Sequence, residues 1–569
     1  MKLIEYYRVL KELKLIQVAY RAKYIIKRKL VEQFSKSITL YYYKKSIKKG
    51  ITTACNKEQF LINKRSYYKY NLNEVFEYSF TFLNEKIQFN NQIEWNHGKL
   101  NHGTRLWKLN LHYHEWLIDV VDLYLRTKEE KYLIYFCDAI NDWIKQNPIG
   151  TKDYGKDNWN SYCISLRLVA WIKIYSKIEQ DLSEEFKERF LRSVRMQVDF
   201  LVDNLELDIL GNHLIKNWKA LIWAGYFFDE NKYLKKAEKI EKNYILTQFT
   251  KDGLHEEMSP MYTGIVLEDL LEVYSLNRKE LLREQIIKSA EALAPLVNEN
   301  EYLLFNDSVN NNEVSVKDLN ILLKTIVGKG LFIEGTFNVS GYVGLKQHDM
   351  HLVFDTASAI SSPQPGHLIC DQLSFELFVK NRKIFTNSGV YEYNNGARRK
   401  YARSTESHNT LKIGELNQSE VVGSFRVMRR SKTESNILSL KRNRIIIKGK
   451  VDGFDFKGTY HEREINYTNN TLIIEDYYNS PMQYSASIYF HLHPDITPLK
   501  FVSGYKLLYQ DVLIAEMLME NLETELTKTD FYPEFGKKLK KHTIIIHNSL
   551  PNVKSICKIL IYEKDIPYI

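Results

Sequence analysis

The hydrophobic pattern of this chain changes its period once, and that change limits the folds open to it. From about residue 105 to 327, apolar residues recur at helical spacing, as in LNLHYHEWLIDVVDLYL and HLIKNWKALIWAGYFF. From about residue 340 onward, short runs such as LSFELFV, RIIIKGKV and HTIIIHN are typical of strands. The pattern therefore predicts a helical part followed by a β part, with the boundary near 328–340.

The number of segments indicates how each part packs. Seven or more amphipathic segments in succession are too many for a four-helix core, so we expect helical hairpins in a bundle, a solenoid or a ring. Many short strands separated by turn residues predict an antiparallel sandwich. With 569 residues the chain has room for two or three domains. We expect a basic N-terminal arm and lead-in at 1–90, a helical domain at 91–335 and a β domain at 336–569.

The positive charge is concentrated at the N-terminus. Residues 1–50 contain fourteen Lys or Arg against three Glu, a net charge of +11, so the rest of the chain sums to about −1. Apolar residues recur at roughly helical spacing between these lysines. One interpretation is a basic amphipathic arm that contacts anionic lipid or an anionic polymer, and the other is a solvated helix packed on the body. A nucleic-acid binder is disfavoured because the body is near neutral.

Targeting signals and cysteines bear on the compartment. No stretch has eighteen consecutive apolar residues, and the N-terminal segment lacks the apolar core and cleavage site of a secretory signal. Five widely spaced cysteines indicate neither a disulfide framework nor a zinc knuckle. We therefore expect a cytoplasmic protein, with a peripheral contact to the membrane as an addition.

Polar residues that could do chemistry gather at a few places. Asn212-His213 opens a helical segment, where an asparagine is most often an N-cap. The stretch DGLHEEMSPMY, residues 252–262, contains Ser-Pro, which reads as a cap followed by a first-turn proline. His367 stands at the start of a strand pattern in GHLICDQLSFELF, and His408 precedes another in RSTESHNTLKIG. Each of these signals is weak alone.

Together the stretches resemble the heparinase II/III-like family of polysaccharide lyases. Asn212-His213-Leu214 resembles the family's Asn-His-Leu element, and EEMSPMY resembles its Glu-x-Ser-Pro-Met-Tyr element. GHLICDQLSFEL, TNSGVYEYNNG, RSTESHNT and NQSEVVGSFRVMRR are similar in order and spacing to four further blocks. Upstream helical segments resemble the branch often encoded among capsule and exopolysaccharide genes. The resemblance implies an N-terminal α/α toroid, a C-terminal antiparallel β-sandwich and an active cleft between them, in agreement with the change of period.

The chemistry that the resemblance implies is β-elimination at a uronic acid. Such an enzyme must neutralise the uronate carboxylate, remove the C5 proton and protonate the leaving oxygen at C4. Asn212 and His213 suit the first role, while Tyr262 and His367 would share the proton transfers. Which of these two is the base depends on the face that carries the C5 hydrogen, and stays open. The expected function is a polysaccharide lyase acting on a uronate-containing glycan, in capsule or exopolysaccharide metabolism.

Further side chains are candidates for substrate contacts, as aromatic platforms or as partners of a carboxylate. They are Trp107, Asn110, His112, Tyr113, Trp159 and Arg403. Each could equally belong to the core or to a structural ion pair. The expected partner is an acidic polysaccharide.

Two departures from the family pattern bear on whether the chain binds a metal. Aligned on LSFEL, Ile369 stands where the family usually has a metal-binding histidine, and Asn387 where it has an aspartate. His408 aligns with the third ligand. Isoleucine has no donor atom and asparagine is a poor neutral ligand for zinc, so we expect no metal and no other cofactor.

Two other functions stay open. A glycoside hydrolase on the same toroid would need two separated carboxylates, whereas adjacent Glu256 and Glu257 would point apart. A non-catalytic glycan-binding protein of polysaccharide assembly would keep the cleft without turnover. Binding alone does not explain why all four proposed catalytic side chains are present.

Overall fold

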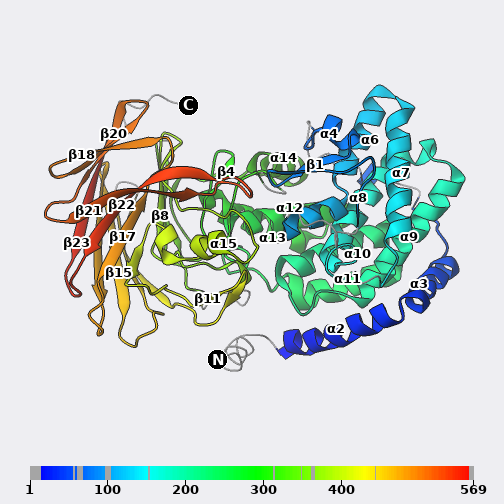
Figure 1. Ribbon diagram of the computed structural model, residues 1–569, viewed down its shortest axis with the longest axis horizontal. Helices are drawn as coiled ribbons and strands as arrows, with labels where there is room; N and C mark the ends of the chain where they lie inside the picture. Colours follow the sequence, from blue (N-terminus) through cyan, green and yellow to red (C-terminus); the bar gives the residue numbers. More distant parts are fainter. Residues whose placement is uncertain are drawn as a thin grey trace. The chain divides into compact units, whose positions relative to one another are not determined.

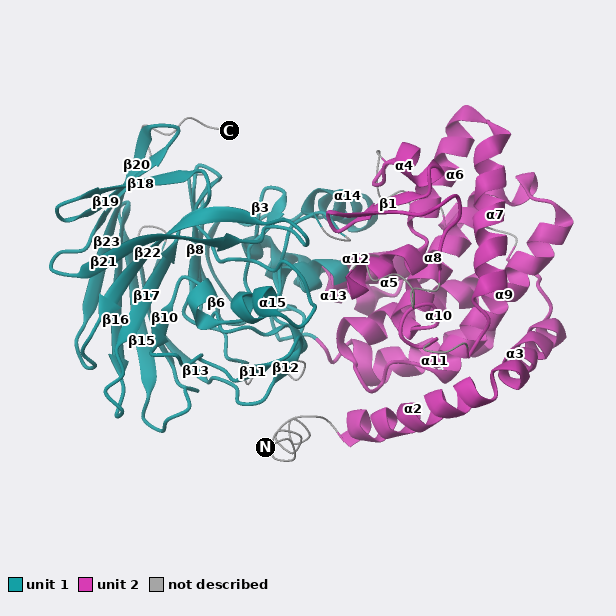
Figure 2. Ribbon diagram, viewed as in Figure 1, with its two compact units in different colours: residues 1–12, 249–265, 287–569 teal, residues 13–248, 266–286 magenta. Residues whose placement is uncertain are grey.

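The computed structural model describes residues 15–54, 58–60, 68–95, 104–150, 154–311, 314–347, 349–359, 365–441 and 444–562. The described chain divides into two compact units (Figure 2). Unit 1 takes residues 249–265 and 287–569, and unit 2 takes residues 13–248 and 266–286. The domain boundaries expected from the sequence stay a prediction.

Unit 2 is helical (Figure 1). Side-chain caps begin several of its helices: the Thr104 hydroxyl accepts from Trp107 N at 3.2 Å, and Asn160 and Ser183 cap two others. The helices are α2 (Leu15–Gln33), α3 (Ser35–Lys49), α4 (Leu72–Phe76), α5 (Arg105–Tyr113), α6 (Trp116–Thr127), α7 (Glu130–Gln146), α8 (Ser161–Ile178), α9 (Glu184–Asp203), α10 (Gly211–Phe227) and α11 (Asn231–Ile240), with α12 (Pro260–Asn277) and α13 (Glu280–Leu293) divided between the units. A hairpin of β1 (Ser79–Phe82) and β2 (Glu85–Gln88) joins them.

Helices α8 and α10 form the centre of unit 2. They pack against each other, and α8 also packs against α5, α6 and α9. Nearly every side chain of both helices is buried, as expected for helices that are apolar around most of their circumference. The lysines inside are paired: Lys219 lies 2.6 Å from both Asp269 and Glu272. Pairing removes most of the cost of burying these charges.

The described part of the basic segment, α2 and α3, packs on unit 2, while residues 1–14 lie outside the described residues. Gln17 Nε2 donates to Ile209 O at 3.1 Å, and the buried Tyr24 hydroxyl donates to Leu205 O. In α3, Lys49 Nζ lies 2.5 Å from Asp199 Oδ1. The helices thus contact the segment that precedes α10, as the packed-helix interpretation expects.

Unit 1 is built on antiparallel sheets. An eight-stranded sheet has the order β13-β14-β15-β16-β23-β20-β19-β18, a four-stranded sheet has β10-β17-β22-β21, and a five-stranded sheet has β5-β6-β7-β8-β9. Side chains of β15 and β16 alternate between buried and partly exposed, as the period of two predicts. One apolar core contains Phe375, Ile447 and Ile544, one from each sheet, so the sheets share a single interior.

The strands of these sheets include the runs LSFELFV, RIIIKGKV and HTIIIHN, which contribute to β8, β14 and β22. They are β5 (Gly335–Val339), β6 (Tyr342–Lys346), β7 (Met350–Asp355), β8 (Phe375–Val379), β9 (Arg382–Phe385), β10 (Leu411–Ile413), β13 (Thr433–Lys441), β14 (Arg444–Val451), β15 (Tyr460–Thr468), β16 (Thr471–Asn479), β17 (Ala486–His491), β18 (Ile496–Phe501), β19 (Gly504–Tyr509), β20 (Val512–Leu518), β21 (Glu523–Phe531), β22 (Leu539–Asn548) and β23 (Ser555–Ile561). Short pairs β3 (Val297–Asn298) with β4 (Glu301–Tyr302) and β11 (Val421–Val422) with β12 (Arg426–Val427), and helices α14 (Val316–Val327) and α15 (Ala397–Ala402), complete the unit. None of the described helices is long and apolar enough to cross a membrane.

Candidate active site

A cluster in unit 1 brings two of the predicted catalytic residues together. The rings of Tyr262 and His367 are stacked, with centroids 3.8 Å apart. The Tyr262 hydroxyl lies 2.9 Å from the hydroxyl of Tyr393, and His367 Nδ1 lies 3.1 Å from Asp307 Oδ2. Arg399 holds the same carboxylate with two hydrogen bonds of 2.6 and 2.7 Å. We call these five side chains the tyrosine–histidine cluster.

Local structure positions Tyr262 and Asp307. Ser259 caps α12, because its hydroxyl accepts from Tyr262 N at 3.3 Å. The same hydroxyl donates to Asp307 O at 2.9 Å and lies 2.8 Å from the Ser308 hydroxyl. The Ser-Pro pair is therefore a helix cap, as its sequence predicts, and it also ties the start of α12 to the segment that carries Asp307.

Charge pairing keeps Asp307 ionised. Burial alone would raise the pKa of its carboxyl, but Arg399 and His367 together hold that pKa below its usual value. An ionised Asp307 accepts hydrogen bonds and does not donate them, so His367 Nδ1–H donates to it. Neutral His367 then has Nε2 as the nitrogen that can take up a proton.

Tyr262 is held in its protonated form. Its side chain is buried, and burial raises its pKa well above the usual value, with Tyr393 and Asp307 adding to the effect. A neutral phenol that donates or accepts a hydrogen bond is the stable state near neutral pH. Tyr262 thus keeps its proton until a stronger base, such as a departing alkoxide oxygen, takes it.

Two buried carboxyls lie behind the cluster. Asp371 Oδ2 accepts from the backbone N of Asn306 at 2.6 Å, and burial raises the pKa of Asp371 to about 7. Asp355 is buried nearby, and its pKa is raised well above the usual value by burial and by Asp371. Like charges in a dry site favour a shared proton, so this pair holds one near neutral pH.

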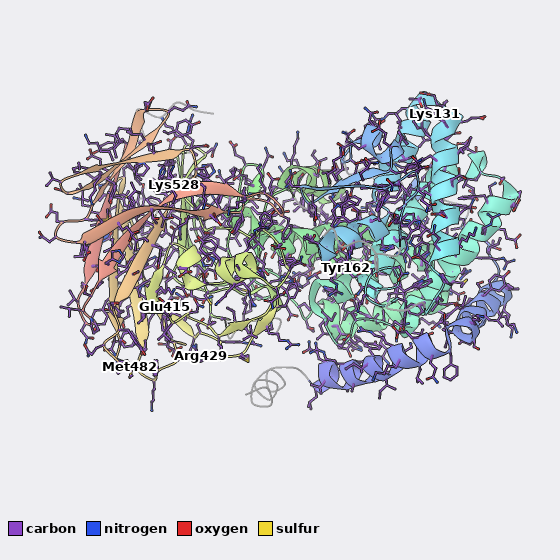
Figure 3. The ribbon with its side chains drawn as sticks, in the orientation of Figure 1. Lys131, Tyr162, Glu415, Arg429, Met482 and Lys528 are labelled. Carbon is purple, nitrogen blue, oxygen red and sulfur yellow. The ribbon has the colours of Figure 1, made fainter. Side chains whose placement is uncertain are left out.

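A second cluster lies in unit 2, at the start of α10. His213 Nδ1 lies 2.9 Å from Glu206 Oε1, and the ring of His213 is 4.6 Å from that of Tyr162, labelled in Figure 3. Asn217, one turn further along α10, donates to Glu206 Oε2 at 3.0 Å and accepts from Glu206 N at 2.8 Å. Asn212 is buried beside them. We call this group the asparagine–histidine cluster.

The backbone before α10 is strained. Leu210 has φ +66° and Gly211 has φ +57°, and the left-handed region is costly for a leucine. The N-cap position of α10 is Leu210, which makes no side-chain cap, so the interpretation of Asn212 as an ordinary N-cap is wrong. The two hydrogen bonds between Glu206 and Asn217 hold the turn in place and offset part of the strain.

Three of the predicted substrate contacts are buried side chains with partners inside their own unit. Trp107 is fully buried and its Nε1 donates to Glu85 O, and His112 is fully buried and accepts from Trp143 Nε1. Arg403 is buried and donates to the backbone oxygens of Gly423 and Leu368. These contacts match the alternative that the three side chains belong to the core, because buried side chains present no open face to a sugar.

The other three candidates also make contacts within unit 2. Asn110 donates to Leu106 O within its own helix, and Tyr113 is buried in a small cluster with Tyr162 and Leu166. Trp159 is mostly buried and its Nε1 donates to Asn147 O. We leave all six out of the proposed function.

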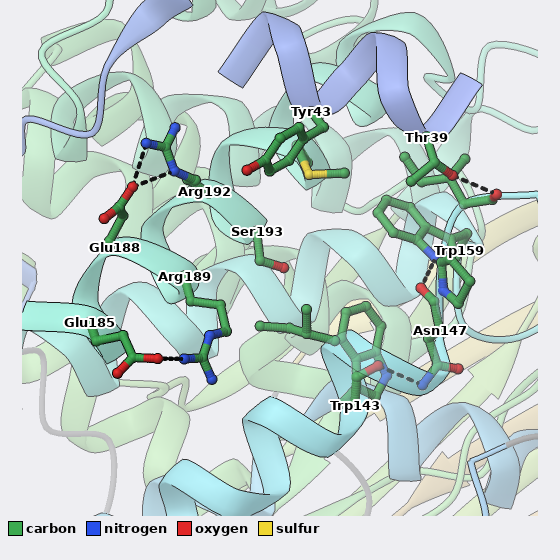
Figure 4. A pocket seen from close by; sticks show the side chains of 14 residues that line it. Thr39, Tyr43, Trp143, Asn147, Trp159, Glu185, Glu188, Arg189, Arg192 and Ser193 are labelled. Atoms are coloured by element: carbon green, nitrogen blue, oxygen red, sulfur yellow. Dashed lines mark hydrogen bonds and ion pairs between the residues drawn. The ribbon is translucent and has the colours of Figure 1, made fainter. Parts of the chain in front are cut away.

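Trp159 does line a pocket of about 400 Å³ in unit 2 (Figure 4). Thr39 and Tyr43 of α3 form one side, and residues of α7 and α9 form the others. Its arginines are already paired, Arg189 with Glu185 and Arg192 with Glu188, so the wall has no surplus of positive charge for an acidic sugar. We assign this pocket no function.

The residues at the family's metal position do not fit a metal. Ile369 is buried and offers no donor atom. Both ends of the Asn387 amide are used, by Ser374 Oγ at 3.2 Å and Asn409 N at 3.1 Å. Burial lowers the pKa of His408 to about 3, only partly offset by backbone hydrogen bonds. Among the described residues, no group of three or more His, Cys, Asp and Glu side chains is placed to hold a metal.

Sequence reasoning missed five side chains of the two clusters. Tyr393 lies inside the quoted TNSGVYEYNNG block, so the resemblance could have led to it. Arg399 follows another arginine, and Asp307 and Glu206 lie in irregular segments without a motif. Tyr162 looks like an ordinary core residue of α8. Only the folded chain brings these four to their partners.

Family models match most of the chain. Residues 11–293 match the heparinase II/III N-terminus, and residues 334–560 match the heparinase II/III-like C-terminal model. The chain belongs to the heparinase II/III-like family. The motifs that carried the resemblance therefore identified it correctly.

Known members of the family are distant relatives. A heparin-sulfate lyase of Bacteroides thetaiotaomicron is 23% identical over 467 residues, which cover 72% of this chain and 64% of that protein. A heparin-sulfate lyase of Pedobacter heparinus is 23% identical over 370 residues, 58% of this chain and 55% of that protein. The chain thus spans less than two thirds of the length of these relatives.

Solved structures establish the fold. The chain resembles a crystal structure of heparinase III with a TM-score of 0.69 and 19% identity, covering 84% of this chain and 80% of that one. A heparan sulfate lyase from Pedobacter heparinus gives a TM-score of 0.59 at 16% identity, over 94% and 89% of the two chains. The prediction of an α/α toroid followed by an antiparallel β-sandwich is confirmed.

Proposed function

We propose that this protein is a polysaccharide lyase that cleaves a uronate-containing glycan by β-elimination. The observation that carries the proposal is the tyrosine–histidine cluster, in which a neutral phenol stacks on an imidazole oriented by an ionised carboxylate. The relatives named heparin-sulfate lyase support an acidic glycosaminoglycan as substrate.

We assign the proton transfers from the hydrogen bonds in this cluster. His367 Nε2 removes the C5 proton, while Asp307 holds the Nδ1 proton and stabilises the imidazolium that forms. The electron pair of the C5–H bond becomes the C4–C5 double bond as the C4–O bond breaks. Tyr262 gives its proton to the departing oxygen, and the Tyr393 hydroxyl lies beside the phenolate that remains.

The asparagine–histidine cluster is assigned to the uronate carboxylate. Glu206 accepts a hydrogen bond from His213 Nδ1, and a protonated His213 would donate to the carboxylate from Nε2. Donors aimed at the carboxylate stabilise the negative charge that grows there as C5 loses its proton. Asn212 supplies the neutral donor of the pair.

The experiment is to incubate the protein with a panel of uronate polysaccharides and to record the ultraviolet absorbance of a 4,5-unsaturated product. The panel includes heparan sulfate, chondroitin sulfate and the capsule of the organism from which the chain comes. We expect absorbance with at least one acidic glycan and none with His367→Ala. New reducing ends without absorbance would instead indicate a hydrolase, and binding without either product would indicate a glycan-binding protein.

A further inference from the structure

The helix α2 presents its main apolar stripe to water. Its inward side contacts unit 2 through Gln17, Tyr24 and Val31, which recur every seven residues and are buried. The opposite side carries exposed apolar residues at helical spacing. They are Leu15, Ala19, Ala22, Ile26 and Leu30. A helix that packs on a globular body usually turns such a stripe inward, so this arrangement is reversed.

The exposed side continues along α3. The two helices follow one another along the outside of unit 2 (Figures 1 and 2), and Phe34 N between them donates to Leu30 O at 2.9 Å. Leu40 and Ile47 of α3 are also exposed. Together the outward apolar residues of α2 and α3 form what we call the outer face. A run of apolar side chains that is exposed along two successive helices is typical of an interaction site.

The charge beside the outer face is strongly positive. Residues 15–49 contain ten Lys or Arg and one Glu. Lys45 and Lys49 pair with Asp199, whereas Lys23 and Lys29 of α2 and Lys44 of α3 are exposed. Basic side chains next to an apolar stripe fit a surface that offers negative charge above a hydrocarbon layer.

We propose that the outer face binds the surface of an anionic lipid membrane, with α2 and α3 lying in the plane of the headgroups. The apolar residues enter the acyl boundary and the lysines contact lipid phosphates. A second copy of this chain fits less well, because two equally basic faces would repel each other. An acidic polysaccharide would satisfy the lysines but would leave the apolar stripe in water. The proposal is independent of the lyase function.

The test uses point variants of the full chain, because α2 also supports the segment before α10. The variant Ile26→Ser/Leu30→Ser changes two exposed residues of the outer face, and Ile26 is 62% exposed. The matched control, Ile134→Ser/Leu281→Ser, changes residues of unit 2 that are 56% and 59% exposed but lie outside that face. Flotation is measured with vesicles containing about one third phosphatidylglycerol and with neutral phosphatidylcholine vesicles.

The wild type and the control should float with the acidic vesicles, and the outer-face variant should bind them at least about tenfold more weakly. Binding should also fall when salt is raised from about 0.1 M to 0.5 M, since exposed charges are screened. Melting temperatures of the variants should match the wild type, because surface substitutions change stability little. The proposal is overturned if the wild type does not float, if the outer-face variant floats equally well, or if that variant instead changes the molar mass in light scattering.

Discussion

Tyr262 and Tyr393 offer a matched pair of substitutions that separates catalysis from structure. Their hydroxyls share one hydrogen bond of 2.9 Å, so Tyr262→Phe and Tyr393→Phe each remove one oxygen and break the same bond. A hydroxyl left without its partner in a buried place costs about 1–3 kcal/mol. The two variants should therefore lose similar stability, observed as similar drops in melting temperature.

Their effects on turnover should differ widely. Tyr262 stacks on His367 and is assigned the proton that the leaving oxygen receives, so Tyr262→Phe should lower kcat about 100- to 10,000-fold. Tyr393 only lies beside that hydroxyl, and loss of a neutral hydrogen bond of about 0.5–1.5 kcal/mol corresponds to a decrease of roughly tenfold or less.

The assay is the initial rate of ultraviolet absorbance on whichever glycan the wild type cleaves, together with glycan affinity and thermal melting. Affinity should stay near the wild-type value in both variants, since the change is confined to the transition state. Equal losses of kcat in the two variants would refute the assignment of Tyr262 as the proton donor, because the proton would then depend on both phenols. A Tyr262→Phe enzyme with wild-type turnover would refute it directly.

Three further predictions test the surroundings of the clusters. Asp371→Asn should raise the melting temperature relative to the wild type increasingly from about pH 4 to pH 7. The folded-state pKa of Asp371 is raised to about 7, so the wild type loses stability as pH rises from its unfolded pKa to that value, and the difference levels off above it. A difference that does not depend on pH would contradict this. Asn212→Ala should lower kcat and also weaken glycan binding, since its donor meets the carboxylate in both ground and transition states, and a change in KM alone would argue against a role in the reaction. Chelators should leave the melting temperature unchanged, and elemental analysis should find no stoichiometric zinc or calcium. The reason is that Ile369 and Asn387 supply no ligands. A drop in melting temperature on chelation would reveal a site built from other residues.

The fold could be predicted from the sequence because it rests on periodicity. The alternation in β15 and β16 and the apolar circumference of α8 and α10 are local patterns that tertiary packing did not override. The motif residues Tyr262 and His367 were found for a different reason, since the resemblance supplied their roles and the structure placed their rings 3.8 Å apart.

The partners of the catalytic side chains could not be predicted, because they depend on contacts between distant segments. Asp307 reaches His367 across 60 positions, and Arg399 reaches Asp307 across 92. The six predicted substrate contacts stay predictions for a related reason. Aromatic and cationic residues serve both sugars and cores, and only burial distinguishes Trp107 inside unit 2 from a residue on a surface.

The segment around Ile369 shows which contacts hold the stretch that follows His367 in place. Ile369 N donates to Asn306 Oδ1 at 3.2 Å, which ties the stretch after His367 to the residue beside Asp307. Lys541, a buried residue of β22, donates to Ser388 Oγ at 2.9 Å and to Thr386 O at 3.4 Å. These two residues stand on either side of Asn387. Contacts of four residues therefore join the segments that a metal would join in the family pattern. They are Ile369, Asn306, Asn387 and Lys541. Because these contacts form with the fold itself, we expect the orientation of His367 to depend on the packing of unit 1.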